Sequence, residues 1–169
     1  MSYVYHDSIG NILAISKENI LTFNSITKVT FVPNLQLDVN YQFYMIDDNG
    51  TLRENVEAYR TYKHQEMSDA MDIAFGNRVF MSSFGFTVDN RRSGTKNDKD
   101  NVNSLITLGA PSAPFKSHDG SVHILSNAQL QQLQMEMIQD GFSVYQKKWV
   151  LDAQIDQALN NTQLSLIEW

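Results

Sequence analysis

The strongest constraint on the fold is a long helical pattern near the carboxy terminus. Between residues 128 and 159, in the segment AQLQQLQMEMIQDGFSVYQKKWVLDAQIDQAL, apolar residues recur at intervals of three and four. That spacing keeps the apolar side chains on one side of an α-helix. Ser126 or Asn127 can cap its start, and Gly141 is a position where it could kink. The pattern therefore predicts one long helix over these residues.

Around residues 137 to 145 this predicted helix is apolar on more than one face. One series follows Leu130, Leu133 and Met137, and a second begins at Ile138 and continues in steps of four, three and four. A helix with a single apolar stripe packs on its own domain, whereas a more widely apolar helix is enclosed or meets a partner. The candidate interface residues come from this helix and from the last residue of the chain. They are Met137, Ile138, Phe142, Tyr145, Trp149 and Trp169.

The last ten residues, NNTQLSLIEW, are unusually apolar for a chain end. Thr162 is predicted to cap a final turn that folds Leu164, Ile167 and Trp169 back onto the long helix. Packing within the chain is the favoured cover for Trp169, because ordered carboxy-terminal elements usually dock on their own domain. A partner chain is the alternative cover.

Residues 1–57 predict β structure instead. The runs SYVYHD, NILAIS and ITKVTFV are rich in β-branched and aromatic residues. Asn49-Gly50, between YQFYMI and TLRENV, is the clearest hairpin signal because both positions tolerate a positive φ. We expect three to five antiparallel strands, which must bury one face against another part of the protein.

Residues 58–169 alternate between helical, strand-like and loop patterns. The segment AYRTYKHQEMSDAMDIAFGNRVF has helical spacing, with Gly76 as an end or kink, and SSFGFTVDN alternates like a strand. A short helix in KDNVNSLITL should stop at Gly109, and HDGSVHILS should form a turn and a strand. The predicted fold class is α+β: a small amino-terminal antiparallel β module (1–57), then an α+β module (58–169) with the long carboxy-terminal helix.

The charge of the chain opposes nucleic-acid binding. Thirteen Lys and Arg stand against 19 Asp and Glu, a net charge of −6, whereas such binding needs clustered cations. The local basic cluster at residues 91–99 is interrupted by Asp98, so we interpret it as a solvated loop. The absence of cysteine excludes disulfides and cysteine-ligated metals, and no window approaches the roughly 18 apolar residues that membrane insertion requires.

No group of residues predicts catalysis, a metal or a cofactor. His118, Asp119 and His123 lie close in sequence, but HDG is an ordinary turn and no third metal ligand lies nearby. Asp98 and Asp100 resemble the start of a calcium loop without its glycine or its acid at the twelfth position. Capping of the following helix explains these two acids better.

Residues 59–169 resemble an uncharacterised domain family found at the carboxy-terminal end of many bacteriophage tail proteins. The resemblance rests on FGFTVDNRRSGTKNDKDNVNSLI, HDGSVHILSNAQLQQLQMEMIQDGFSVYQKKW and LDAQIDQALNNTQLSLIEW. Within the last segment, residues 155–158 match an Ile-Asp-x-Ala pattern of the family. The residues before this domain are similar to the small β modules that precede it in such proteins.

This resemblance implies a structural phage tail, baseplate or tail-fibre protein that binds other proteins and is not an enzyme. Its expected partners are other phage tail proteins and copies of itself, since a broad apolar helix face suits a symmetric oligomer. Its expected location is the virion tail, after assembly in the host cytoplasm. A tail-fibre assembly chaperone is the alternative. A glycan-degrading enzyme would need paired carboxylates in a cleft, and the available pairs, Asp47–Asp48 and Glu66–Asp69, are better explained as turn and helix surface.

Overall fold

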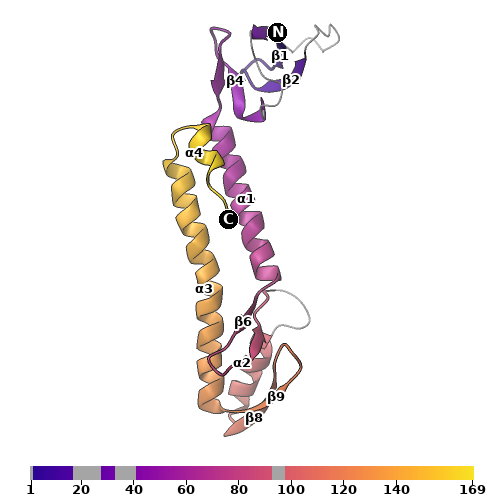
Figure 1. The fold of residues 1–169 in the computed structure, drawn as a ribbon, viewed down its shortest axis with the longest axis vertical. Helices are drawn as coiled ribbons and strands as arrows, with labels where there is room; N and C mark the ends of the chain where they lie inside the picture. Colours follow the sequence, from indigo (N-terminus) through magenta and orange to yellow (C-terminus); the bar gives the residue numbers. More distant parts are fainter. Residues whose placement is uncertain (1, 17–27, 33–40, 93–97) are drawn as a thin grey trace. The chain divides into compact units, whose positions relative to one another are not determined.

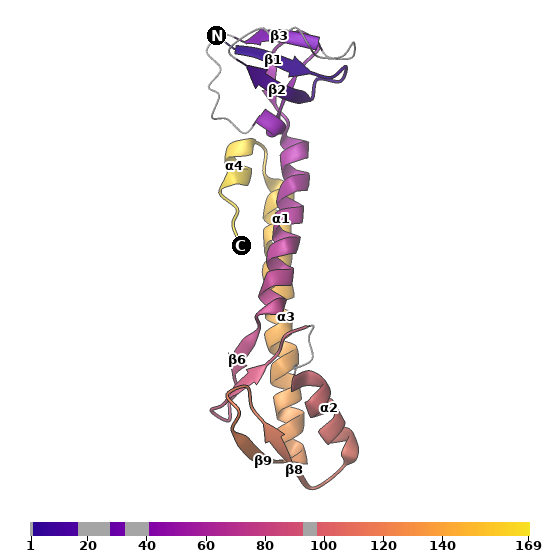
Figure 2. The ribbon, with the colours of Figure 1, turned by 90° about the vertical axis from the view of Figure 1, so that its right-hand side faces the viewer.

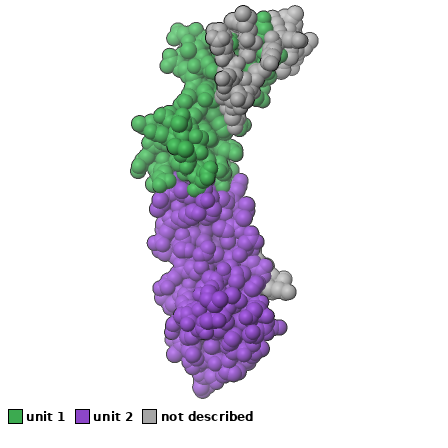
Figure 3. All heavy atoms as spheres, viewed as in Figure 1, with its two compact units in different colours: residues 1–66, 153–168 green, residues 67–152, 169 purple. Residues whose placement is uncertain are grey.

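The computed structural model describes residues 2–16, 28–32, 41–92 and 98–169 (Figure 1). The start of the predicted strand ITKVTFV and Lys96 of the basic cluster lie outside these residues. The chain forms two compact units, residues 1–66 with 153–168 (unit 1) and residues 67–152 with Trp169 (unit 2), coloured separately in Figure 3. The β-to-helix change predicted near residue 57 coincides with the start of the first helix, while the compact units divide the chain at other positions.

The strands of unit 1 form two small antiparallel sheets. Strands β1 (Ser2–His6), β2 (Ile12–Ser16) and β3 (Lys28–Val32) pair in the order β2-β1-β3. A short 3-10 helix, η1 (Tyr41–Phe43), leads into the hairpin of β4 (Tyr44–Ile46) and β5 (Leu52–Glu54). The apolar faces of these strands meet in a core of Val4, Ile12 and Ile46.

The turn predicted at Asn49-Gly50 is present. Gly50 has a φ of 75°, and the Asp47 carboxylate accepts hydrogen bonds from the backbone N–H groups of Asn49 (3.0 Å) and Thr51 (2.9 Å). The side chain of Asp47 thus closes the turn by bonding the backbone two residues ahead, as Asp commonly does in such turns.

Two long helices cross from one unit into the other. Helix α1 (Val56–Gly76) passes the boundary after Glu66, and α3 (Asn127–Gln157) passes it before Ala153. The prediction of a long carboxy-terminal helix is confirmed, and α3 continues through Gly141 as one helix. The α+β fold class is likewise confirmed.

Unit 2 places two hairpins and a short helix along the first half of α3 (Figures 1 and 2). The hairpins are β6 (Val79–Met81) with β7 (Thr87–Asp89) and β8 (Ser112–Lys116) with β9 (Val122–Ser126). Helix α2 (Asp98–Leu108) lies between them in sequence and ends before Gly109, whose φ is 68°. The shared core is Phe86, Val88, Val102, Ala113, Phe115, Leu125, Leu130, Leu133 and Met137.

Strands β6 and β8 correct the sequence analysis. Helix α1 ends at Gly76, one of the two outcomes expected there, and the residues that follow it form β6, a strand that was not predicted. Strand β8 was not predicted, and it contains Pro114, a residue that usually argues against a strand. A two-stranded sheet tolerates proline because each strand keeps one unpaired edge. Alternate residues of β8, Ala113 and Phe115, are buried as in an ordinary half-buried strand.

The chain end packs within unit 1, as expected, but with a different cap. Helix α4 (Asn161–Ser165) begins after Asn160, whose side chain accepts a hydrogen bond from the Gln163 N–H at 2.9 Å. The prediction that Thr162 is the cap was therefore wrong. Leu164 and Ile167 are buried, and the Asn161 side chain donates to the Phe43 carbonyl (2.8 Å).

Candidate functional site

Helix α3 is held in unit 2 by its cap and by one buried face. Ser126 accepts a hydrogen bond from the Gln129 N–H (3.2 Å), and the Gln129 side chain accepts one from the Ser126 N–H (2.9 Å). This reciprocal pair is a capping box, so Ser126 is the cap. The buried face of α3 within unit 2 consists of Leu130, Leu133, Met137, Val144 and Leu151.

A second apolar face of α3 lies open to solvent. We call it the α3 strip, and it consists of Ile138, Phe142, Tyr145 and Trp149. Ile138 is 53% exposed, Phe142 46% and Trp149 56%, while Tyr145 is half-buried. Spacings of four, three and four residues are those of positions d and a in a coiled-coil heptad.

The rings of the α3 strip touch one another. The Phe142 and Trp149 rings meet edge to face with centroids 5.6 Å apart, and Tyr145 lies 6.2 Å from Trp149. These contacts hold the rings together along the helix without removing them from water. The strip is therefore an ordered apolar surface on a well-anchored helix.

Not all of the predicted interface residues belong to this surface. Met137 is only 4% exposed and packs in the core of unit 2, so it is not part of the exposed strip, although it lines the groove described below. It lies one residue before Ile138, and a step of about 100° on the helix carries it from the open face to the buried one. Trp169 is half-buried within unit 2, with the Lys147 ammonium 4.9 Å from its ring centroid.

A groove of about 500 Å³ lies beside the α3 strip in unit 2. Its lining includes Ile138, Phe142 and Tyr145 of the strip and Phe75 of α1. It also includes the charged side chains Arg91, Arg92, Lys99 and Asp100. This volume lies within the range of known ligand pockets, about 300–1,000 Å³.

Arg92 is positioned by the aromatic rings of the groove. Its guanidinium lies 5.4 Å from the centroid of Phe75 and 6.0 Å from that of Tyr145, within the range of cation–π attraction. Its backbone N–H donates to the Phe75 carbonyl at 3.2 Å. Arg92 is therefore exposed but held in place, and the interpretation of this segment as a solvated loop was incomplete.

Arg91 is bound to a buried carboxylate. Its Nε donates to both oxygens of Asp89 (2.8 and 3.0 Å), and its Nη2 also contacts Asp89. These hydrogen bonds keep the pKa of Asp89 below its usual value. Asp98 accepts a hydrogen bond from the Asp89 N–H (2.8 Å), and burial raises its pKa. Asp98 thus joins the start of α2 to the end of β7, a role that helix capping did not predict.

Arg78 and Asn90 fix the groove to α3. Arg78 donates two hydrogen bonds to the Asp140 carboxylate, at 2.6 and 2.9 Å. The Asn90 amide donates to Asp140 and to the Met137 carbonyl, both at 2.8 Å. Two ordered charge-assisted contacts to one carboxylate give a rigid attachment. The sequence carried no signal for it, because Arg78 and Asp140 lie in separate elements.

The predicted turn is present at residues 118–120, between β8 and β9. Ser117 donates its hydroxyl to Asp119 (2.6 Å), and the Ser121 N–H donates to the same carboxylate (2.9 Å). These bonds lower the pKa of Asp119 to about 2. His123 Nε2 lies 3.2 Å from Ser117 Oγ, but Asp119 holds the hydroxyl proton and Ser117 is buried. The arrangement therefore stabilises a turn and presents no nucleophile.

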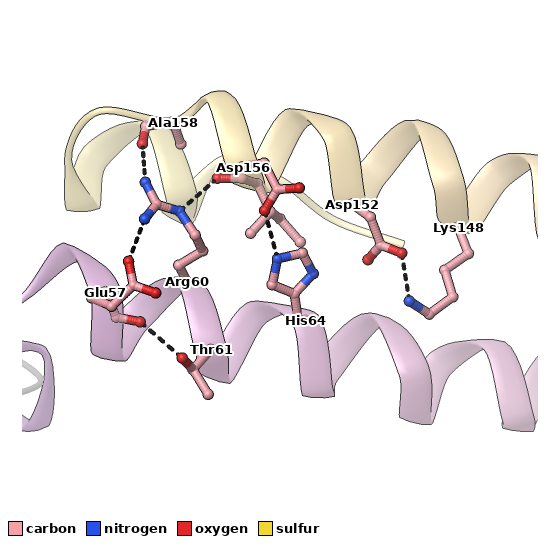
Figure 4. A network of polar contacts seen from close by, with 9 residues as sticks. Glu57, Arg60, Thr61, His64, Lys148, Asp152, Asp156 and Ala158 are labelled. Atoms are coloured by element: carbon pink, nitrogen blue, oxygen red, sulfur yellow. Dashed lines mark hydrogen bonds and ion pairs between the residues drawn. The ribbon is translucent and has the colours of Figure 1, made fainter.

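In unit 1, polar contacts join α1 to the end of α3 (Figure 4). Arg60 donates to the carbonyls of Ile155 (3.3 Å) and Ala158 (3.0 Å), and His64 Nε2 lies 3.0 Å from Asp156 Oδ1. The Ile155 carbonyl also accepts from the Ala158 N–H (3.2 Å), so Arg60 adds a second donor there and places a cation at the negative, carboxy-terminal end of the helix. Of the Ile-Asp-x-Ala pattern at residues 155–158, Asp156 contacts His64 through its side chain, and Ile155 and Ala158 are buried.

The described residues offer no candidate for a metal site or a membrane span. No three His, Asp or Glu side chains among them gather as metal ligands would. Among the same residues, every helix is too short or too polar to cross a bilayer.

A family model described as a domain of unknown function, DUF4376, matches residues 59–167, well over half of the chain. Neither a curated protein nor a solved structure matches. The matched region contains the α3 strip, the groove and the Arg60 contacts.

Proposed function

The chain belongs to the DUF4376 family, and we propose that it is a structural component of a bacteriophage tail that binds other proteins through the α3 strip. The phage setting comes from the resemblance of residues 59–169 to the carboxy-terminal domains of phage tail proteins. The binding role comes from the surface of the chain itself.

The exposure of the α3 strip is the observation that carries this proposal. Ile138, Phe142 and Trp149 are about half exposed on a helix whose opposite face is already buried in a core. Covering the remaining surface of such side chains yields roughly 1 kcal/mol each. Apolar patches of this kind commonly mark protein–protein contacts, and aromatic residues are enriched at the centre of such contacts.

The proposal is tested by replacing strip residues with a polar residue that suits a helix. The variants F142Q and W149Q should fold normally but fail to enter tail particles, measured by quantitative mass spectrometry of purified virions. V150Q is the matched control, because Val150 is 58% exposed on the same helix yet about 100° away from Trp149.

Loss of incorporation in both strip variants, with normal incorporation of V150Q, supports the proposal. Normal incorporation of F142Q and W149Q contradicts it. Absence of the unmodified protein from virions, with binding to a free fibre, would favour an assembly chaperone instead.

A further inference from the structure

We propose that the segment covering the α3 strip is an amphipathic helix of a different protein, with acidic side chains along the edge that meets Arg92 and Lys99. This inference rests on the proposed docking function and specifies its partner. It is carried by two observations, the heptad spacing of the strip and the charge of the groove beside it.

The spacing of the strip favours a helical partner. Its residues follow one another at four, three and four positions, so they form a nearly straight row along α3. Helices that pack into such a row present apolar side chains at the same repeat, and an amphipathic helix in an apolar groove is a common recognition mode. The groove next to the row gives such a helix room on one side.

The charge of the groove favours acidic residues on that helix. Within the described part of the chain, Arg92 and Lys99 form no ion pair with a carboxylate. Arg91 is already neutralised by Asp89, and Asp100, the acid in the groove lining, has a polar interaction of its own. Two cations therefore remain available on the groove wall of a chain whose net charge is −6.

A second copy of this chain suits the site less well than a different protein. The α3 residues that flank the strip at heptad positions e and g include Gln134, Gln139 and Gln146, which are neutral. Another α3 would therefore bring no acid to Arg92 and Lys99. Symmetric packing of two strips would instead bring these cations of both copies toward the same interface, and like charges disfavour association.

Two synthetic helical peptides test this inference. Both carry Leu at heptad positions a and d, and one has Glu at positions e and g where the other has Lys. Fluorescence anisotropy with the full chain should show the Glu peptide binding at least about tenfold more tightly at low salt, with the difference shrinking as salt rises. The F142Q variant should lose binding of both peptides, and V150Q should keep it.

Charge reversal provides the specific control. K99E changes an exposed side chain, and R92E changes the cation over the aromatic rings, so each variant is checked by circular dichroism before use. Either change should reduce the preference for the Glu peptide, and the double variant should favour the Lys peptide.

The possible failures are distinguishable. Equal binding of the two peptides would overturn the acidic partner while leaving the strip as a docking surface. Binding of neither peptide would overturn helix docking and weaken the proposed function with it. A dimer of the chain alone that F142Q dissociates, measured by light scattering, would place a second copy on the strip and overturn the inference.

Discussion

Asp98 carries a carboxylate in a buried position beside a second buried carboxylate, Asp89. Burial raises the pKa of Asp98 above 3.8, and the charge of Asp89 adds to the rise, although the hydrogen bond from the Asp89 N–H opposes it. A carboxyl with a raised pKa costs stability when it is ionised, and lowering the pH through that pKa removes the cost. The same side chain therefore both opposes folding through its charge and supports it through its hydrogen bond.

Substitutions at Asp98 separate these two effects. D98N keeps an acceptor for the Asp89 N–H and removes the charge, so its free energy of unfolding, relative to the unmodified protein, should be higher at pH 7 than at pH 3. D98A leaves the buried N–H without its acceptor and should lose about 1–3 kcal/mol. Urea unfolding across this pH range measures both. If the difference in free energy of unfolding between D98N and the unmodified protein does not change with pH, the proposed cost of the Asp98 charge is contradicted.

Gly10 is the residue at which backbone conformation matters most in unit 1. Its φ is 92°, and a Cβ placed there would lie 2.1 Å from the Ile46 carbonyl oxygen. Its own carbonyl accepts a hydrogen bond from the Ile46 N–H at 2.9 Å. This close approach connects the first sheet to β4, and only glycine allows it.

G10A should therefore be strongly destabilising, because it adds a backbone clash to the strain of a positive φ. G109A is the matched control, since Gly109 also has a positive φ but an added Cβ would meet nothing within 4 Å. Thermal unfolding should show a small loss for G109A, of about 1–2 kcal/mol, and a larger one for G10A. Equal losses of stability in G10A and G109A would contradict a destabilising clash between the added Cβ and the Ile46 carbonyl.

At the scale of elements, helical periodicity was the reliable guide. Helices α1, α2 and α3 were all predicted, because an amphipathic helix buries one face and so repeats apolar residues every three or four positions. Strands β6 and β8 were not predicted: β6 directly follows a helical pattern, and β8 contains Pro114, a residue that usually argues against a strand. The residues of the α3 strip were predicted from the same periodicity. Only the structure shows that Met137 packs in the core and does not belong to the strip.

The groove and the helix-end contacts were beyond sequence reasoning for a different reason. Arg92 meets Phe75 and Tyr145 from separate elements, and Arg60 reaches carbonyls almost a hundred residues away. Such contacts depend on how elements pack, which local spacing does not encode. The basic cluster at residues 91–99 was the one available signal, and alone it indicated only solvent exposure.

The start of α4 gives a prediction at this scale. Asn160 supplies the cap by accepting from Gln163, so N160A should destabilise the protein by about 0.5–2 kcal/mol. T162A is the control, because Thr162 is exposed and lies inside the helix. Chemical denaturation measures the free energy of unfolding of both variants and so distinguishes the two caps. A larger loss for T162A than for N160A would indicate that Thr162 is the cap.

At the scale of the whole molecule, unit 1 combines the first part of the chain with nearly all of its last part, while Trp169 belongs to unit 2. Residues 153–168 complete a unit that otherwise consists of residues 1–66, and Leu164 and Ile167 are buried there. The apolar chain end is thus a structural part of the protein. This agrees with the expectation that it packs within the chain.

Removal of residues 166–169 should lower the stability of unit 1. It deletes Ile167, whose burial contributes roughly 1.5–3 kcal/mol, so the melting temperature should fall by several degrees. Differential scanning calorimetry measures this directly. An unchanged melting temperature, with loss of incorporation into tail particles, would instead assign the chain end to a neighbouring protein.

Photocrosslinking from the α3 strip in assembled tail particles tests the central claim most directly. Benzoyl-phenylalanine replaces Phe142 in one variant and, as a control, Leu108, which is exposed at the end of α2 in the same unit. We expect the probe at position 142 to form a single adduct with another tail protein and the probe at position 108 to form none. No adduct from position 142, or the same adduct from both positions, would contradict the claim that the α3 strip is a docking surface.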